Sequence, residues 1–205
     1  GGRSINLRGR DLRFARLDRS DLRRADLAGA NLDGASFTGS DLRQIWLLCD
    51  DRTDLRRSEN RQTVRCASAR GTNFAKAKLA GAQMSGLDVR GARFEGAQLD
   101  GVNLNNAQMT GVDFSRADLQ RADLSGGATL QGANFEQANL QGADLSGASL
   151  QMADFTGATM QGATLSLANL EGAVLRDTAL EGAGLQGAKL FGADMRGAKL
   201  HFADM

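Results

Sequence analysis

The sequence predicts an all-β fold, a four-sided parallel β-helix. Three observations support it: an apolar residue stands at every fifth position, glycine ends most of the five-residue words, and phenylalanine returns every fourth word. Residues 133–155, "ANFEQANLQGADLSGASLQMADF", show the word clearly. Each word reads Ala, a polar residue, Leu or Phe, and then two variable residues.

The period of five excludes an ordinary helix or strand. A step of five residues turns an apolar side chain by about 140° around a helix, so the apolar residues form no stripe. In a strand, an odd period places successive apolar residues on opposite faces. Each word must therefore contain its own corner. The glycines agree, because 22 of 26 end a word, where a residue with φ > 0 closes a tight turn.

The phenylalanines give the number of sides. We count 37 words, whose central residues run from Leu7 to Leu47, from Ala69 to Leu124 and from Leu130 to Met205. Six of the nine phenylalanines are central residues, and each lies four words after the one before. A coil therefore has four sides and 20 residues, and six rings stack on one inner face: Phe37, Phe74, Phe94, Phe114, Phe135 and Phe155. About nine coils, stacked at about 4.8 Å, make a rod about 43 Å tall.

The words "ADLAGANLDG" (25–34) and "ANLQGADLSG" (138–147) resemble the Ala-(Asp/Asn)-Leu-x-x pattern of the pentapeptide-repeat family. The resemblance covers residues 5–205 and implies a right-handed helix, the hand also expected for parallel crossovers. We expect a single domain over 5–205, with residues 1–4 a leader or an expression remnant. The chain opens "GGRSI" without methionine, so we interpret it as a fragment whose native N-terminus is missing.

Charge bears on the best-known activity of the family. Some members bind DNA gyrase as acidic rods that imitate duplex DNA, which requires a net negative surface. This chain has a net charge of +1, and residues 1–70 carry 15 arginines against 10 acidic residues. We therefore expect a non-catalytic protein-binding or scaffold module with an unidentified partner and no direct contact with nucleic acid. The alternative is a DNA-mimicking modulator of DNA gyrase or another topoisomerase.

The words are interrupted after Cys49 and resume at Ala67, which leaves a 17-residue insertion at 50–66. Trp46 and Leu48 lie at outward positions beside it, so we expect the insertion to cover them. It is either a recognition element or a tolerated insertion. The residues proposed to contact a partner are Arg23, Arg43, Trp46, Arg52, Arg56, Arg57, Arg61 and Arg65. The alternative for these arginines is a solvated surface on which they pair with neighbouring aspartates.

No catalytic, cofactor or metal site is expected. The single histidine, His201, lies in the last word, and a lone histidine is more often a surface residue than a catalyst. "GAGLQG" (182–187) matches a dinucleotide fingerprint but lacks the flanking strand and helix. The acidic residues of the insertion are interspersed with arginines and lack the spacing of a calcium loop: Asp50, Asp51, Asp54 and Glu59.

Two expectations concern assembly and compartment. The C-terminal coil ends with its apolar interior open, which predicts either end-to-end dimerisation or a cap in missing sequence. Cys49 ends the word before the insertion, and Cys66 immediately precedes the word that begins at Ala67. In an uninterrupted rod Ala67 would follow Cys49 directly, so the ends of the insertion must return close together and we expect a Cys49–Cys66 disulfide. The bond would favour the bacterial envelope or an extracytoplasmic location; reduced thiols would favour the cytoplasm. A membrane link would depend on sequence missing from this chain.

Overall fold

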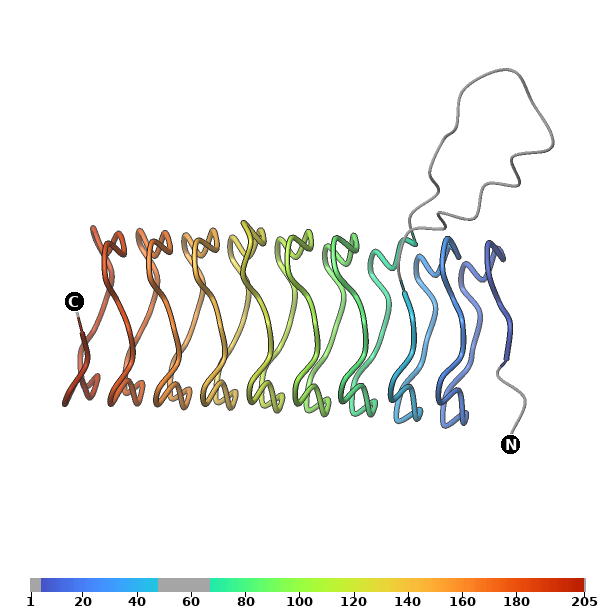
Figure 1. The fold of residues 1–205 in the computed structure, drawn as a ribbon, viewed down its shortest axis with the longest axis horizontal. Helices are drawn as coiled ribbons and strands as arrows, with labels where there is room; N and C mark the ends of the chain where they lie inside the picture. The colour runs from blue at the N-terminus through green and yellow to red at the C-terminus, as the bar shows by residue number, and fades with distance from the viewer. Residues whose placement is uncertain (1–4, 48–66, 205) are drawn as a thin grey trace, which may run out of the picture.

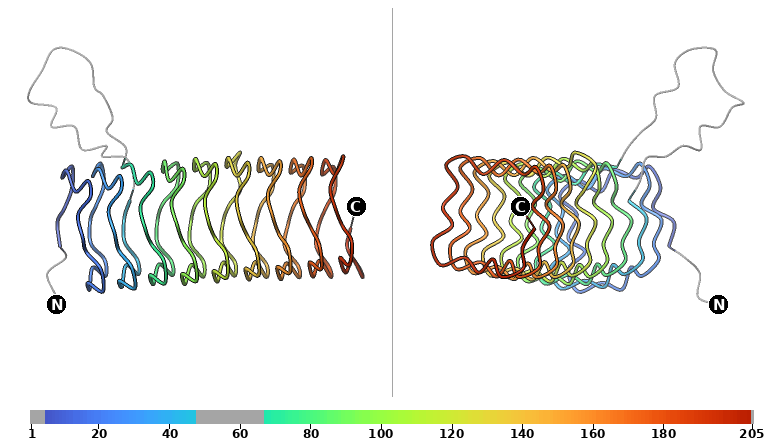
Figure 2. Two further views of the ribbon diagram at one scale, coloured as in Figure 1. Left: turned by 180° about the vertical axis from the view of Figure 1, so that it is seen from behind. Right: turned by 60° about the vertical axis from the view of Figure 1, so that its left-hand side comes forward.

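The computed structural model describes residues 5–47 and 67–204, which form one straight rod (Figure 1). The chain winds around the rod axis from one end to the other, so its two termini lie at opposite ends (Figures 1 and 2). The predicted leader 1–4, the insertion 50–66, Leu48 and the Cys49–Cys66 bond lie outside the described residues. Within the two described ranges there is no helix.

Each extended element is a single residue that forms a parallel bridge to the coil above and the coil below. The first four bridges join Asn6 to Asp26, Asp11 to Asn31, Arg16 to Ser36 and Asp21 to Asp41, so one coil takes 20 residues. We number the four sides of the rod by these residues: face 1 begins at Asn6, face 2 at Asp11, face 3 at Arg16 and face 4 at Asp21.

Two irregularities lie at the corner between faces 1 and 2. The bridge from Trp46 to Gln83 spans 37 residues instead of 20, because the chain between them contains the insertion. The bridge from Gln108 to Thr129 spans 21 residues, because Gly127 is an extra residue at this corner. The four faces stay aligned along the rod in spite of the insertion and Gly127. In both cases the extra residues lie at a corner between two faces and interrupt neither face.

Backbone hydrogen bonds hold successive coils together. The central residue of a word donates its N–H to the coil that follows, as Leu79 does to the Gln98 carbonyl at 2.7 Å. The bridge residue donates to the preceding coil, as Lys78 does to Ser40 at 2.8 Å. A third bond closes the corner, from the Ala82 N–H to the Leu79 carbonyl at 2.9 Å. The regular repetition of these bonds satisfies the buried peptide groups without a continuous strand.

The last residue of every described word has positive φ. Glycines fill most of these corners, but thirteen other residues adopt φ between 53° and 61°: Phe14, Arg19, Arg24, Gln44, Lys76, Asn106, Arg116, Arg121, Gln137, Met152, Leu167, Asp177 and Phe202. This conformation costs a residue with a Cβ roughly 1–2 kcal/mol. The hydrogen bonds of the neighbouring coils impose it, so the corner geometry does not depend on glycine.

At several corners the side chain of one coil lies over the glycine of the next coil. The Met152 Sδ is 2.6 Å from the place that a Cβ on Gly172 would occupy, and a Leu167 methyl carbon is 2.9 Å from the same place on Gly187. The Phe14 ring lies over Gly34 at 2.7 Å in the same way. At these corners glycine therefore provides space for a side chain from the preceding coil as well as conformational freedom.

The core is a continuous column along the axis. From Leu27 to Leu180 the central residues are at most 2% exposed within the described part, and the alanines two positions before them are also buried. Where a hydroxyl replaces alanine it bonds inward: Thr72 Oγ1 donates to the Leu32 carbonyl at 2.8 Å, and Thr178 Oγ1 to the Phe155 carbonyl at 2.9 Å. In the last coil Leu190, Met195 and Leu200 are only partly buried.

The six central phenylalanines stack along face 3. Successive ring centroids lie 4.7–5.4 Å apart, and the planes are inclined by 2–23°. All six side chains are fully buried. The stacking distance follows from the separation of the coils, because each coil contributes one ring to the same column.

Candidate protein-binding surface

Arg23 and Arg43 lie one coil apart on face 4, and both pair with aspartates of their own words. Arg23 Nη2 is 2.6 Å from Asp21, and Arg43 Nη2 is 2.6 Å from Asp41. Arg23 Nε is also 3.8 Å from Asp41, which links the two coils. The sequence left open whether these arginines bind a partner or pair with aspartates; the structure shows the pairing. Their charge is already neutralised locally, which weakens them as contacts for an acidic partner.

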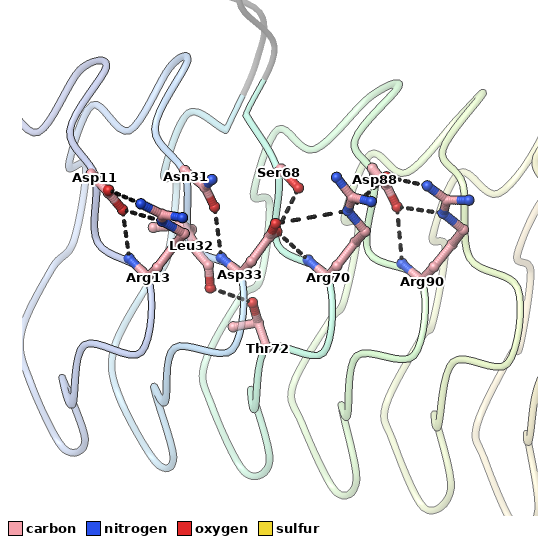
Figure 3. A network of polar contacts seen from close by, with 10 residues as sticks. All are labelled: Asp11, Arg13, Asn31, Leu32, Asp33, Ser68, Arg70, Thr72, Asp88 and Arg90. Atoms are coloured by element: carbon pink, nitrogen blue, oxygen red, sulfur yellow. Dashed lines mark hydrogen bonds and ion pairs between the residues drawn. The ribbon is translucent and has the colours of Figure 1, made fainter.

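The same pairing recurs on face 2, as Figure 3 shows. Arg13 pairs with Asp11 at 2.6 Å and Arg90 with Asp88 at 2.8 Å. Arg70 Nε lies 3.3 Å from Asp88, so the contact continues from coil to coil. In the words of Arg13 and Arg90, the aspartate at the bridge position and the arginine two residues later point the same way, because residues i and i+2 share one side of an extended segment.

These pairs shift the pKa of the aspartates. The side-chain hydrogen bond from Arg23 lowers the pKa of Asp21 to about 2. Hydrogen bonds from Arg196 and Arg176 likewise hold the pKa of Asp194 well below its usual range. All of these side chains face solvent, so the pairs contribute little to stability and are screened by salt.

Trp46 is the candidate residue that projects a large apolar surface. It bridges Asp26 and Gln83 on face 1, and its side chain is 54% exposed. Beside it lies a hollow of about 410 Å³. The hollow is lined by Arg24, Gln44, Trp46, Gly81 and Gln83. The remaining candidates Arg52, Arg56, Arg57, Arg61 and Arg65 lie outside the described residues, and so does the segment expected to cover Trp46.

The lining residues come from three successive coils. Arg24 Nε donates to Gln44 Oε1 at 3.1 Å, which ties two coils together at the corner between faces 4 and 1. Gly81 follows at the same corner, and nothing lies within 4 Å of the place that a Cβ would take there. Gln83 Nε2 donates to the Gly81 carbonyl at 3.3 Å. The absence of a side chain at residue 81 therefore leaves open the space beside the indole.

Sequence reasoning missed five further exposed apolar residues. Each is at least 70% exposed: Phe14, Met152, Leu167, Phe191 and Phe202. Four of them occupy corners, and Phe191 immediately precedes a corner glycine. The sequence could have identified these residues, because the two variable positions of a word do not point to the core. A large apolar residue at either position is therefore expected to be exposed.

Acidic side chains dominate the rod between Asp113 and Glu181. Within the described residues, nine carboxylates of this stretch form no ion pair: Asp113, Asp118, Asp123, Glu136, Asp144, Asp154, Glu171, Asp177 and Glu181. The arginines of the stretch bond to carboxylates of other coils, Arg116 to Glu95, Arg121 to Asp100 and Arg176 to Asp194. The section from Asp113 to Glu181 is therefore acidic, although the whole chain has a net charge of only +1.

The other sequence features show no arrangement for chemistry. His201 is exposed, and in "GAGLQG" Gly182 and Gly187 are corner residues while Gly184 is a bridge residue of face 1. Over residues 5–47 and 67–204, no three His, Cys, Asp or Glu side chains are grouped to hold a metal ion. The same residues contain no helix long and apolar enough to cross a membrane.

A family model described as pentapeptide repeats matches the chain in 8 copies, over residues 5–44, 66–96, 90–126, 127–162 and 158–197. The chain belongs to the pentapeptide repeat family. Its fold is therefore a right-handed β-helix, in agreement with the sequence prediction. Pentapeptide repeat proteins are typically structural or binding modules and not enzymes.

Solved structures of other pentapeptide repeat proteins align with most of this chain. HetL, involved in heterocyst differentiation regulation in the cyanobacterium Nostoc sp. strain PCC 7120, is 28% identical; the alignment covers 98% of this chain and 87% of HetL, with a TM-score of 0.43. QnrB1, a plasmid-mediated fluoroquinolone resistance protein, is 19% identical over 97% of this chain and 92% of its own, with a TM-score of 0.46. No curated protein sequence matches this chain.

Proposed function

We propose that this pentapeptide repeat protein is a non-catalytic module that binds a protein partner through the surface around Trp46. The observation that carries the proposal is the exposed indole of Trp46 beside a surface hollow of about 410 Å³. Tryptophan is enriched at the energetic centres of protein interfaces, because it buries a large surface with few rotatable bonds. A rigid backbone holds it in place before binding, which reduces the ordering cost of association.

The test is capture of partners by immobilised protein from a lysate of the source organism. Wild-type protein is compared with Trp46→Ala, and Phe191→Ala serves as the matched control because Phe191 is an exposed aromatic residue on another face. A partner that is retained by the control and lost with Trp46→Ala, and that binds directly after purification, supports the proposal. If both variants retain every captured protein equally, the Trp46 surface is not the interface.

One observation favours a second function, modulation of DNA gyrase. The nine carboxylates between Asp113 and Glu181 that lack ion pairs give part of the rod the sign of charge that a site for DNA phosphates attracts. Supercoiling assays with and without a quinolone separate the two functions. Inhibition or protection by micromolar protein, abolished when these aspartates and glutamates are changed to asparagine and glutamine but unaffected by Trp46→Ala, would establish the gyrase function and overturn our preferred one.

We also propose that the rod associates end to end through its C-terminal coil. Its support is the partial exposure of Leu190, Met195 and Leu200, whose counterparts from Leu27 to Leu180 are buried. Light scattering over a range of protein concentrations tests it. A dimer that is lost with Met195→Lys supports association through this coil, and a monomeric mass at every concentration contradicts it.

A further inference from the structure

The hollow beside Trp46 is suited to a ligand without net charge. No carboxylate is among the described residues that line it, so nothing there pairs with a lysine or arginine. Among the same described residues Arg24 is the one cation, and it donates to Gln44 Oε1 at 3.1 Å, whereas recognition of a phosphate commonly uses clustered arginines. Charge complementarity therefore argues against a basic segment, and the described lining lacks the arginine cluster that is typical of sites for phosphorylated segments.

The lining also disfavours a ligand that is entirely apolar. Beside the indole lie a guanidinium group and two side-chain amides, which together offer several N–H donors. An apolar ligand would remove water from these donors without replacing its hydrogen bonds, which costs free energy. A ligand that fits this lining has an apolar ring or side chain that packs against Trp46. It also has uncharged oxygen acceptors that face Arg24, Gln44 and Gln83.

We propose that the hollow binds a proline-rich, extended segment of a partner protein. A polyproline II segment combines an apolar pyrrolidine ring with solvated backbone carbonyls, and it is already extended, so binding orders little of it. The open space at Gly81 lets the ligand backbone approach the corner closely. The 205 residues of the sequence supply no such segment, because they contain no proline. The inference rests on the proposed protein-binding function and specifies the class of partner.

The chain provides its own reporter for the test. Trp46 is the only tryptophan and the chain has no tyrosine, so the intrinsic fluorescence excited at long wavelength comes from the hollow alone. The 205-residue chain is titrated with octaproline and with a Gly-Ser octapeptide as a flexible, uncharged control. The proposal predicts a saturable change of intensity or wavelength with octaproline and no saturable change with the control. No saturable response to octaproline at millimolar concentration overturns it.

Variants locate the binding by a readout that does not need the tryptophan. Anisotropy of fluorescein-labelled octaproline is measured with wild type, Trp46→Ala, Trp46→Phe and Phe191→Ala. Loss of a buried aromatic contact predicts binding about thirtyfold weaker for Trp46→Ala. Phe191→Ala should bind like wild type, and Trp46→Phe should retain part of the affinity because a ring is still present. Equal affinity of Trp46→Ala and wild type would overturn the proposal.

Two further experiments distinguish failure of this inference from failure of the proposed function. In one, octaproline competes with a purified partner, and in the other a neutral oligosaccharide replaces octaproline. A purified partner that binds through Trp46 but is not displaced by octaproline leaves protein binding intact and refutes the proline-rich class. Displacement by octaproline supports both. A fluorescence response to a neutral oligosaccharide such as cellopentaose, without one to octaproline, would overturn the inference and identify a saccharide site, while the capture experiment would decide the proposed function independently.

Discussion

The phenylalanine ladder on face 3 offers the most direct test of what stabilises the rod. Phe114 stacks between Phe94 at 5.0 Å and Phe135 at 5.3 Å, whereas Phe155 has one ring neighbour, Phe135, at 4.7 Å. Both side chains are fully buried. Changing either to leucine, the residue that continues this column at Leu175, keeps an apolar side chain in a position that accepts it.

The expected cost follows from these contacts. The smaller side chain loses buried surface and leaves a cavity, roughly 1–2 kcal/mol in each variant. Each ring contact that is lost adds about 0.5–1.5 kcal/mol. Phe114→Leu loses two ring contacts and Phe155→Leu loses one. We therefore expect the free energy of unfolding to fall by about 1 kcal/mol more for Phe114→Leu.

Urea denaturation followed by far-UV circular dichroism measures the difference. A double-mutant cycle on Phe114 and Phe135 isolates the stacking term, and a cycle on Leu119 and Leu140, neighbours in the column on face 4, is the aliphatic control. We expect a coupling energy of about 1 kcal/mol for the aromatic pair and less for the aliphatic pair. Equal couplings, or a larger cost for Phe155→Leu than for Phe114→Leu, would refute the role assigned to ring stacking.

Three further predictions concern the corners, the ion pairs and the cysteines. Gly172→Ala should destabilise the rod more than Gly132→Ala, since Met152 occupies the space over residue 172 and nothing lies within 4 Å at residue 132; thermal denaturation should show the difference disappear in a Met152→Gly background. The lowered pKa of Asp21, about 2 against a usual 3.8, means that its stabilising contribution is present above about pH 4 and lost as the pH falls toward 2. At low ionic strength Asp21→Asn should therefore flatten the pH dependence of the urea midpoint slightly in that window, and an unchanged profile there would mean that the exposed pair contributes no measurable stability. The predicted Cys49–Cys66 bond should leave both thiols unalkylated in unreduced protein by intact mass, and two alkylated thiols would exclude it.

The period of five by itself determined the path of the backbone. Because each word carries its own corner, the spacing of the phenylalanines alone required four sides and placed the six rings of residues 37–155 in one column. Local chemistry is enough here, since contacts along the axis repeat every four words, and the insertion and Gly127 add residues only at a corner between words. The pairing of Arg23 with Asp21 was left open, although their spacing of two residues already placed both side chains on the same side of an extended segment.

The tertiary structure decided what the surface presents. The hollow beside Trp46 is built from Arg24, Gln44 and Gly81 on successive coils, and the 17-residue insertion separates two of these in the chain. Whether a corner glycine is open, like Gly132, or covered, like Gly172, depends on the residue one coil earlier. Such features arise between coils. A single word fixes the direction in which a side chain leaves the rod, and only the stacking of coils fixes which side chains it meets.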